Sequence, residues 1–203
     1  MITITNEDNM ALMSRYPDNH FDLAIVDPPY GINFAKTHTG NRWIVRPSKD
    51  WDKSIPSSEY FNELFRVSKN QIIWGGNYFT EHLPPSMGWI VWDKGQRDFS
   101  LADGELAWTS FDRALRMFDF SRAKLNNQRG EHPTEKPHQL YQWLLDKYAK
   151  EGDKILDTHL GSGSIAIACH DYKFDLVACE LDKEYYDMAI SRLNIHQSQL
   201  QMF

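Results

Sequence analysis

A short apolar run that stops at two prolines places the strongest constraint on how this chain folds. Leu23–Val26 leads directly into Asp27, Pro28, Pro29 and Tyr30. A short run with β-branched residues is typical of a buried parallel strand, and prolines cannot continue its hydrogen-bonded ladder. Ligands bind at the carboxyl ends of strands in open α/β sheets. A flat ring bearing an amino group would stack on Tyr30 and donate to Asp27, although an ordinary proline turn gives the same pattern.

A second strand that ends in an acid lies near the carboxyl terminus. Lys154–Asp157 precedes a turn that contains Gly161 and Gly163, and the next apolar strand, 175–179, ends in Glu180. An acid about 20 residues beyond such a turn binds ribose hydroxyls in dinucleotide-binding folds. The third glycine of that fingerprint is missing, so a nucleoside ligand without a pyrophosphate fits better. The strand order predicts an α/β fold with a doubly wound, mostly parallel sheet.

The bulk properties indicate a single globular domain over residues 1–203, because 41% of the residues are hydrophobic and no repeat is present. No apolar run approaches the ~18 residues of a membrane span, and the start lacks the features of a signal peptide. Cys169 and Cys179 are expected to be reduced thiols in the core, which fits a cytoplasmic protein. No metal site is expected, because the histidines we considered lack the usual arrangement of ligands: His132, His138, His159 and His170.

Two locally basic stretches suit contact with DNA, although the net charge of −6 argues mildly against a nucleic-acid partner. In the first, residues 32–53, cations alternate with tryptophans, which stack on bases and pair with phosphates in other proteins. We expect this stretch to be a mobile loop. Solvated surface loops explain both stretches equally well on charge alone. The candidate DNA-binding residues are Lys36, Arg42, Trp43, Arg46, Arg122, Lys124 and Arg129.

The order of these motifs resembles that of the S-adenosylmethionine-dependent amino methyltransferases of DNA, in their permuted β class. Asp27–Tyr30 comes first and the glycine turn of 157–164 comes last. Between them, His132–Pro137 is similar to the His-Pro-Thr-x-Lys-Pro element of that class. Ile73–Phe79 and Trp89–Lys94 look like strands of small members of the phage and restriction–modification type. The resemblance covers nearly the whole chain and implies a Rossmann-like methyltransferase fold with a circularly permuted motif order.

The resemblance implies roles for residues in each motif. Asp27, Pro28, Pro29 and Tyr30 would be the catalytic residues that hold a flipped base. Glu180 would bind the ribose of S-adenosylmethionine. The full set implied to bind this cofactor is Asp8, Asp27, His132, Thr134, Lys136, Asp157, His159, Gly161, Gly163 and Glu180.

The implied positions within the cofactor site differ among these residues. Asp157 and the two glycines would shape the sulfonium end, His132, Thr134 and Lys136 would line the amino-acid end, and Asp8 would lie beside the adenine or its ribose. The sequence departs from the family at one point, where the usual Asp-Pro-Phe is Asp157, Thr158 and His159. His159 would then replace the aromatic contact.

The resemblance implies transfer of a methyl group to adenine N6 in double-stranded DNA. The exocyclic amine is a poor nucleophile, and hydrogen bonds to Asp27 would localise its lone pair. The target lies inside the duplex, so the base must be flipped out. Alternatives are a cytosine-N4 methyltransferase, a methyltransferase of RNA adenine or of a protein amide, and an inactive cofactor-fold binding subunit. Asp27 favours adenine, whereas a protein-amide enzyme would carry Asn there.

The chain leaves little room for a target-recognition region. Family members usually insert many tens of residues before the His-Pro-Thr element, whereas only 111–131 is available here. The resemblance therefore implies relaxed or very short sequence recognition, or help from a second subunit. A homodimer is one arrangement that would supply this help.

Overall fold

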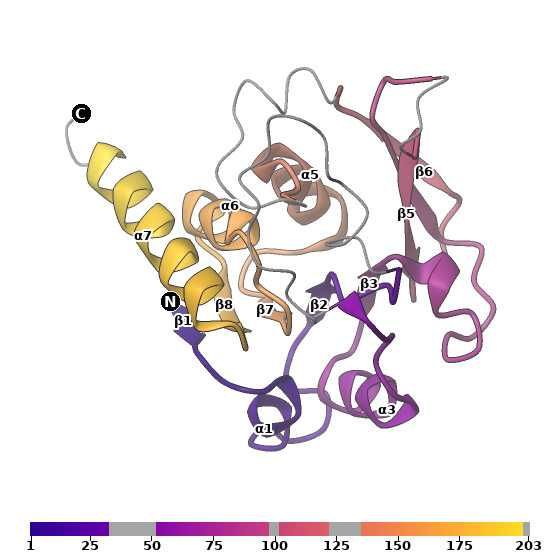
Figure 1. Cartoon of the computed structure of the whole chain (residues 1–203), viewed down its shortest axis with the longest axis horizontal. Coiled ribbons are helices and arrows are strands. Elements are labelled where there is room, and N and C mark those ends of the chain that lie inside the picture. Colours follow the sequence, from indigo (N-terminus) through magenta and orange to yellow (C-terminus); the bar gives the residue numbers. More distant parts are fainter. Residues whose placement is uncertain (33–51, 98–101, 122–134, 201–203) are drawn as a thin grey trace.

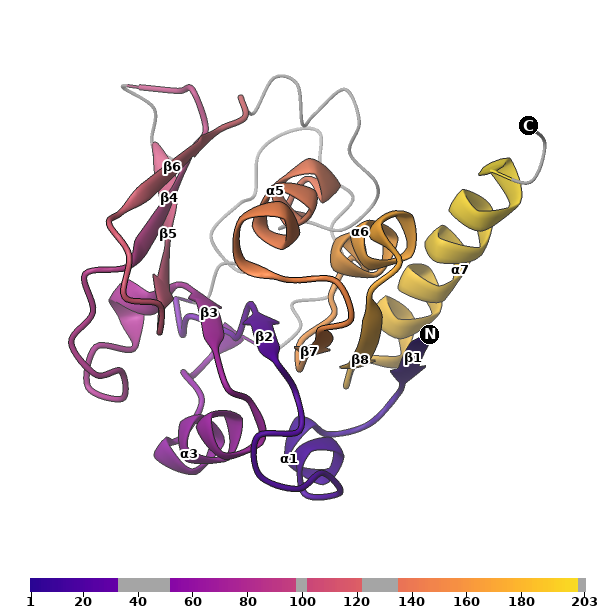
Figure 2. The same cartoon turned by 180° about the vertical axis from the view of Figure 1, so that it is seen from behind.

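The apolar run that ends in two prolines forms a central strand of one large sheet. The computed structural model describes residues 1–32, 52–97, 102–121 and 135–200. These form an eight-stranded sheet with helices on both faces (Figures 1 and 2). The strands are β1 (Ile2–Thr5), β2 (Leu23–Val26), β3 (Gln71–Trp74), β4 (Trp89–Asp93), β5 (Gly104–Thr109), β6 (Arg116–Asp119), β7 (Lys154–Asp157) and β8 (Asp175–Cys179).

The strand order confirms the predicted doubly wound, mostly parallel sheet. The order is β1-β8-β7-β2-β3-β5-β4-β6, and only β5 runs antiparallel to its neighbours. β6 follows β5 directly along the chain, but the two strands are not neighbours in the sheet. β6 pairs in parallel with β4 instead, with Met117 opposite Val91. The reason is that β3 and β4 already occupy both edges of β5.

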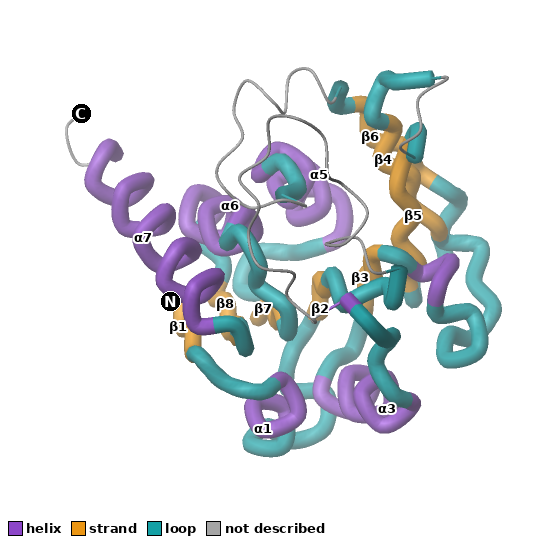
Figure 3. Tube along the Cα trace, in the orientation of Figure 1, coloured by secondary structure: helices purple, strands orange, loops and turns teal. Residues whose placement is uncertain are grey.

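The helices form two layers that enclose the sheet. α1 (Asn9–Met13) and α3 (Ser58–Val67) cover one face, and α5 (His138–Tyr148), α6 (Ser164–Tyr172) and α7 (Lys183–Leu200) cover the other. Figure 3 shows both helical layers in purple on either side of the orange strands. Alternate residues of β2 pack into two hydrophobic cores, one on each face of the sheet, because successive side chains of a strand point to opposite faces. Leu23 and Ile25 pack on the side of α5 and α6, and Ala24 and Val26 pack on the side of α1 and α3.

Local features of the sequence explain where two of the helices begin and end. Asp8 caps α1, because its Oδ1 accepts hydrogen bonds from the backbone N–H groups of Met10 and Ala11. In the structure α7 continues to Leu200, because no glycine or proline follows to end the helix.

At the centre of the sheet, the connections that follow two neighbouring strands lead in opposite directions. From β2 the chain passes through α3 to β3 on one side, and from β7 it passes through α6 to β8 on the other. β2 and β7 are parallel neighbours, with Ala24 opposite Leu156. Ligand-binding crevices form where two neighbouring strands send their connections apart in this way. The carboxyl ends of β2 and β7 therefore define the place to look for a site.

Both cysteines are buried and free, as predicted for core thiols. Burial raises the pKa of each thiol, at Cys169 and Cys179, well above its usual value. In the described part of the chain, none of the helices combines the length and apolar character needed to cross a bilayer.

Candidate active site

The turn after β2 is closed by a buried carboxylate from a distant part of the chain. Asp52 is 3% exposed, and its Oδ1 accepts hydrogen bonds from the backbone N–H groups of Tyr30 and Gly31, both at 2.9 Å. The Tyr30 hydroxyl donates to Asp27 Oδ1 at 2.6 Å. The turn thus presents the Asp27 carboxylate and the Tyr30 ring as one unit. Nothing local in the sequence identifies Asp52, because it lies at the far end of the 32–53 stretch.

A chain of alternating charges extends from Asp27 to the neighbouring strands. Lys136 Nζ donates to Asp27 Oδ2 at 2.5 Å and lies 3.0 Å from Glu105 Oε2. Lys94 Nζ lies 2.6 Å from Glu105 Oε1. Glu105 reaches this edge of the sheet because β5 runs antiparallel, so β5 begins where its neighbours end. The sequence identified Lys136 but missed Glu105, which no motif marks, and gave no role to Lys94 at the end of the Trp89–Lys94 stretch.

The buried charges in this chain stabilise one another. Lys136 is only 4% exposed, and burial opposes its charge, but Asp27 and Glu105 outweigh burial and raise the pKa of Lys136. Burial likewise opposes ionisation of Glu105, but Lys136 and Lys94 lower the pKa of Glu105 to about 2. A charged ammonium therefore holds the Asp27 carboxylate in place. Each carboxylate oxygen can accept more than one hydrogen bond, so Asp27 can still accept from a ligand.

The Tyr30 ring is enclosed by the short 3₁₀ helix η2 (Gly76–Tyr78) and the residues next to it. Tyr30 stacks on Tyr78 with ring centroids 5.0 Å apart and an interplanar angle of 13°. Phe79 packs at its edge. Tyr78 is 42% exposed, so this aromatic pair reaches the surface. Burial raises the pKa of Tyr30 well above its usual value, so its hydroxyl remains a proton donor.

Gly75→Ala is expected to displace the Tyr30 ring. A Cβ at this position would lie 2.2 Å from Tyr30 Cε1, and the backbone φ of +72° adds a cost of about 1–2 kcal/mol for any other residue. The free energy of unfolding, measured by chemical denaturation, should therefore fall by more than this backbone cost. Gly152→Ala is the matched control, because Gly152 has a φ of +86° but no atom within 4 Å of the added Cβ. Equal losses in the two variants would contradict the packing of Gly75 on Tyr30.

The predicted cofactor residues on β7 and β8 come together at the ends of these adjacent strands. Gly161 N–H donates to Glu180 Oε2 at 2.8 Å, and Asp182 N–H donates to Glu180 Oε1 at 2.9 Å. Asp157 is 3% exposed and accepts from the backbone N–H of His159 at 2.9 Å. Burial raises the pKa of Asp157 to about 8, and the nearby Asp27 carboxylate contributes to this shift. Asp157 and Glu180 thus bring two carboxyl groups to this edge of the sheet.

Gly163 serves a packing role. It precedes α6 with a φ of +75°, and an added Cβ would lie 3.0 Å from the Cβ of Ala189 on α7. Its small size therefore allows α7 to approach this turn closely. A role toward the cofactor stays a prediction.

His159 is neutral and fixed by its neighbours. Asn9 Nδ2 lies 3.0 Å from its Nε2, and Thr158 Oγ1 lies 2.9 Å from its Nδ1. Its ring packs edge-on against Tyr60. Burial lowers the pKa of His159 to about 4. Asp8 lies within electrostatic range of this ring, which places the amino-terminal acid on the same side as the β7 turn.

Several predicted site residues lie outside the described part of the chain. Two of them, His132 and Thr134, belong to the implied cofactor set. The others are all the candidate DNA contacts: Lys36, Arg42, Trp43, Arg46, Arg122, Lys124 and Arg129. Of the His-Pro-Thr element, Lys136 is described, and it contacts Asp27. Its neighbour Glu135 forms an ion pair with Arg192 on α7 at 2.6 Å.

Asp157→Asn is expected to flatten the pH dependence of folding stability. The carboxyl has a pKa of about 8 in the folded chain and about 3.9 when unfolded, so the folded state binds its proton more tightly. This contribution to stability is present at low pH and is lost as the pH rises through about 8. Between these values the wild-type chain should lose up to about 1.4 kcal/mol per pH unit relative to the variant. Chemical denaturation across this range tests it, and parallel pH profiles would contradict the burial of a titrating Asp157.

Comparison with curated proteins finds type II methyltransferases. The chain is 25% identical to Type II methyltransferase M.HpaI of Haemophilus parainfluenzae, over 90% of this chain and 71% of that protein. It is 23% identical to Type II methyltransferase M2.DpnII of Streptococcus pneumoniae, over 94% of this chain and 88% of that protein.

Three solved structures illustrate the similarity of fold. The M1.HpyAVI–SAM complex superimposes with a TM-score of 0.64 at 19% identity, covering 95% of this chain and 100% of that one. The putative DNA modification methylase TTHA0409 of Thermus thermophilus, complexed with S-adenosyl-L-methionine, gives 0.62 at 14% identity, with coverage of 97% and 94%. The cytosine-N4-specific PvuII DNA methyltransferase gives 0.62 at 10% identity, with coverage of 93% and 85%. At these identities the likeness establishes the Rossmann-like methyltransferase fold.

The central and carboxyl-terminal part of the chain matches a known protein family. Residues 73–191 match the family N6_N4_Mtase, described as DNA methylase. This region is more than half of the chain and contains the second half of β3 and all of β4 through β8, with Glu105, Lys136, Asp157 and Glu180. The resemblance to the S-adenosylmethionine-dependent methyltransferases of DNA is confirmed, whereas the permuted class stays a prediction. The chain belongs to this family of DNA methylases.

Proposed function

We propose that this chain transfers a methyl group from S-adenosylmethionine to adenine N6 in double-stranded DNA, after the base is flipped out of the helix. The observation that carries the proposal is the position of Asp27 and Tyr30. They lie at the end of β2, directly beside the β7 turn, with Lys136 hydrogen-bonded to the Asp27 carboxylate. This arrangement offers one acceptor for an amine next to a second site for a methyl donor.

The residues at the ends of β7 and β8 suit the methyl donor. S-adenosylmethionine supplies an electrophilic methyl group on a positively charged sulfonium. Asp157 is a buried carboxyl with a raised pKa, so a bound cation would favour its ionised form. The Glu180 carboxylate would accept from ribose hydroxyls through the lone pairs that its two backbone donors leave free. The full cofactor set includes Asp8, His132, Thr134, Lys136, His159, Gly161 and Gly163.

The residues around Asp27 suit the base. The lone pair of an exocyclic amine is delocalised into the ring, so the amine needs activation. Asp27 would accept one amine hydrogen and thereby localise the lone pair on nitrogen. Lys136 fixes the carboxylate at 2.5 Å, which lowers the cost of orienting it. The aromatic pair of Tyr30 and Tyr78 offers a surface on which the extruded base would stack, offsetting the loss of stacking in the duplex.

Cytosine N4 is the second candidate target. The cytosine-N4-specific PvuII enzyme shares the fold at a TM-score of 0.62, and the amine of cytosine would be activated by the same kind of hydrogen bond. The acid at position 27 is the sequence feature that favours adenine. An inactive cofactor-binding subunit is the remaining alternative, and the intact pair of Asp27 and Tyr30 argues against it.

The test is a transfer assay with S-adenosylmethionine labelled on its methyl group. The full chain is incubated with unmethylated DNA, RNA and protein, and the DNA is then hydrolysed and its nucleosides are separated. We expect labelled N6-methyladenine, whereas labelled N4-methylcytosine would favour the second candidate. The absence of transfer to any substrate, with a folded chain that binds the cofactor, would overturn the enzymatic proposal.

We also propose that target recognition is short or relaxed. Within 111–131, residues 116–119 form β6 and are part of the sheet, which shortens the stretch that is free to read DNA. A second copy of the chain is the proposed source of further contacts. Sequencing the methylated sites in cells that express the chain tests this, and a long, strict consensus would contradict it.

A further inference from the structure

A second cluster of polar side chains lies on the helical layer formed by α6 and α7, apart from the residues of the candidate active site. His196 Nε2 lies 2.6 Å from Asp171 Oδ1, and His170 Nδ1 lies 3.4 Å from the same oxygen. The two imidazole rings meet edge to face, with centroids 5.8 Å apart. One ligand atom from each of the three residues can be chosen so that all lie within 4.8 Å of one another.

A third helix orients the carboxylate of this cluster. Gln142 on α5 donates from Nε2 to Asp171 Oδ2 at 3.2 Å. This bond leaves Asp171 Oδ1 directed at the two histidines. Hydrogen bonds of this kind, from outside the ligand set, fix the orientation of metal-binding carboxylates in proteins.

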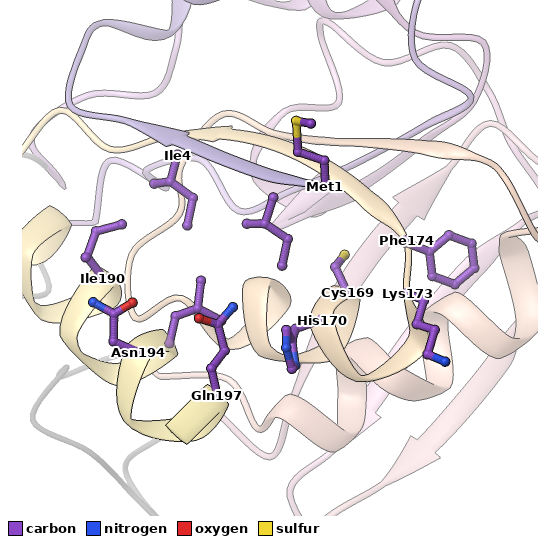
Figure 4. Close-up of a pocket in the computed structure, with 11 residues that line it drawn as sticks. Met1, Ile4, Cys169, His170, Lys173, Phe174, Ile190, Asn194 and Gln197 are labelled. Atoms are coloured by element: carbon purple, nitrogen blue, oxygen red, sulfur yellow. The ribbon is translucent and has the colours of Figure 1, made fainter. Parts of the chain in front are cut away.

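The cluster is open to solvent on one side. All three side chains are partly exposed, and His170 also lines a pocket of about 470 Å³ between β1, the end of α6 and α7. Figure 4 shows His170 in this lining together with Asn194 and Gln197 of α7. An ion can therefore reach the cluster without unfolding the helices.

We propose that His170, Asp171 and His196 bind Zn²⁺, with the remaining coordination position open to water. Two imidazole nitrogens and one carboxylate oxygen are common zinc ligands. Ligand atoms of a tetrahedral site with bonds of about 2.1 Å lie about 3.4 Å apart. His170 Nδ1 and Asp171 Oδ1 already have this separation. His196 must move about 0.8 Å away from Asp171 as the ion replaces the proton they share.

The proposed ion would join the carboxyl-terminal helix to the body of the fold. His170 and Asp171 lie on α6, whereas His196 lies on α7. A ligand that binds only the folded chain stabilises it in proportion to the logarithm of its concentration. This proposal differs from the expectation drawn from the sequence, that the chain has no metal site. That expectation rested on histidines that include His170 but not His196.

The experiment is calorimetric titration of the untagged full chain, first treated with a chelator, with zinc chloride. Wild-type protein should bind one ion, and His170→Ala, Asp171→Asn and His196→Ala should each weaken this binding at least about tenfold, the usual loss when one part of a metal site is removed. His82→Ala is the matched control. His82 is partly exposed and stacks on the core residue Phe61 at 4.9 Å, on the side of α1 and α3, so binding should not change.

Thermal unfolding gives a second readout that is independent of methyl transfer. Zinc should raise the melting temperature of the wild-type chain by several degrees but should not raise that of His196→Ala. Asp171→Asn keeps a hydrogen-bonding partner for His196. It is therefore expected to fold even if His196→Ala does not. Wild-type protein without saturable zinc binding, or folded variants that bind as well as wild type, would overturn the proposal.

Discussion

Asp27→Ala is expected to lower the rate of methyl transfer by at least about a hundredfold, the usual loss when one group that stabilises the transition state is removed. Asp27 is the acceptor that would activate the target amine, and its carboxylate is held by Tyr30 and Lys136. Cofactor binding should remain measurable, because Asp157 and Glu180, which are also implied to bind the cofactor, belong to other strands. Transfer rates with labelled S-adenosylmethionine and calorimetric binding of the cofactor test the two halves separately.

Two control variants distinguish a loss of catalysis in Asp27→Ala from a loss of folding. Asp27→Asn keeps the shape of the side chain but removes its charge, and it should lose activity as well. Asp22→Ala removes an acid at the other end of β2, where it pairs with Lys69 at 2.7 Å, and transfer should continue at the wild-type rate. Near-normal turnover by Asp27→Ala would show that the assigned role is wrong.

Lys136→Met is expected to lower the free energy of unfolding by about 3–5 kcal/mol, the cost of removing one partner from a buried ion pair. Lys136 is 4% exposed and lies between the carboxylates of Asp27 and Glu105. Its loss leaves two acids facing each other, and in the described part of the chain Lys94 is the cation that still pairs with one of them, Glu105. Chemical denaturation near neutral pH measures the loss, and methyl transfer should fall because Asp27 is no longer held.

Two comparisons sharpen the prediction for Lys136. Lys69→Met breaks an exposed ion pair with Asp22, in which Lys69 is 52% exposed, and should lower the free energy of unfolding far less than Lys136→Met because water screens the exposed pair. Adding Glu105→Gln to Lys136→Met removes one of the stranded charges and should restore part of the stability. If Lys136→Met costs no more than Lys69→Met, the buried charge chain does not hold the site.

Local patterns in the sequence determined the strands and turns that carry the site. Leu23–Val26 had to end at Asp27 because prolines follow, and the glycine turn had to separate β7 from α6. These features depend on backbone chemistry and on apolar periodicity within a few residues. They predicted the sheet class, the edge at which ligands bind and the positions of Asp157 and Glu180. The motif order also indicated the family that the comparison with known proteins confirmed.

Only the tertiary structure decided which side chains complete the site. Lys136 reaches Asp27 across 109 positions of the chain, and Glu105 joins them because β5 enters the sheet antiparallel between β3 and β4. Asp52 closes the Tyr30 turn across 22 positions. None of these contacts leaves a local periodicity. Strand order and direction fix them, and these result from the packing of the whole sheet between its two helical layers.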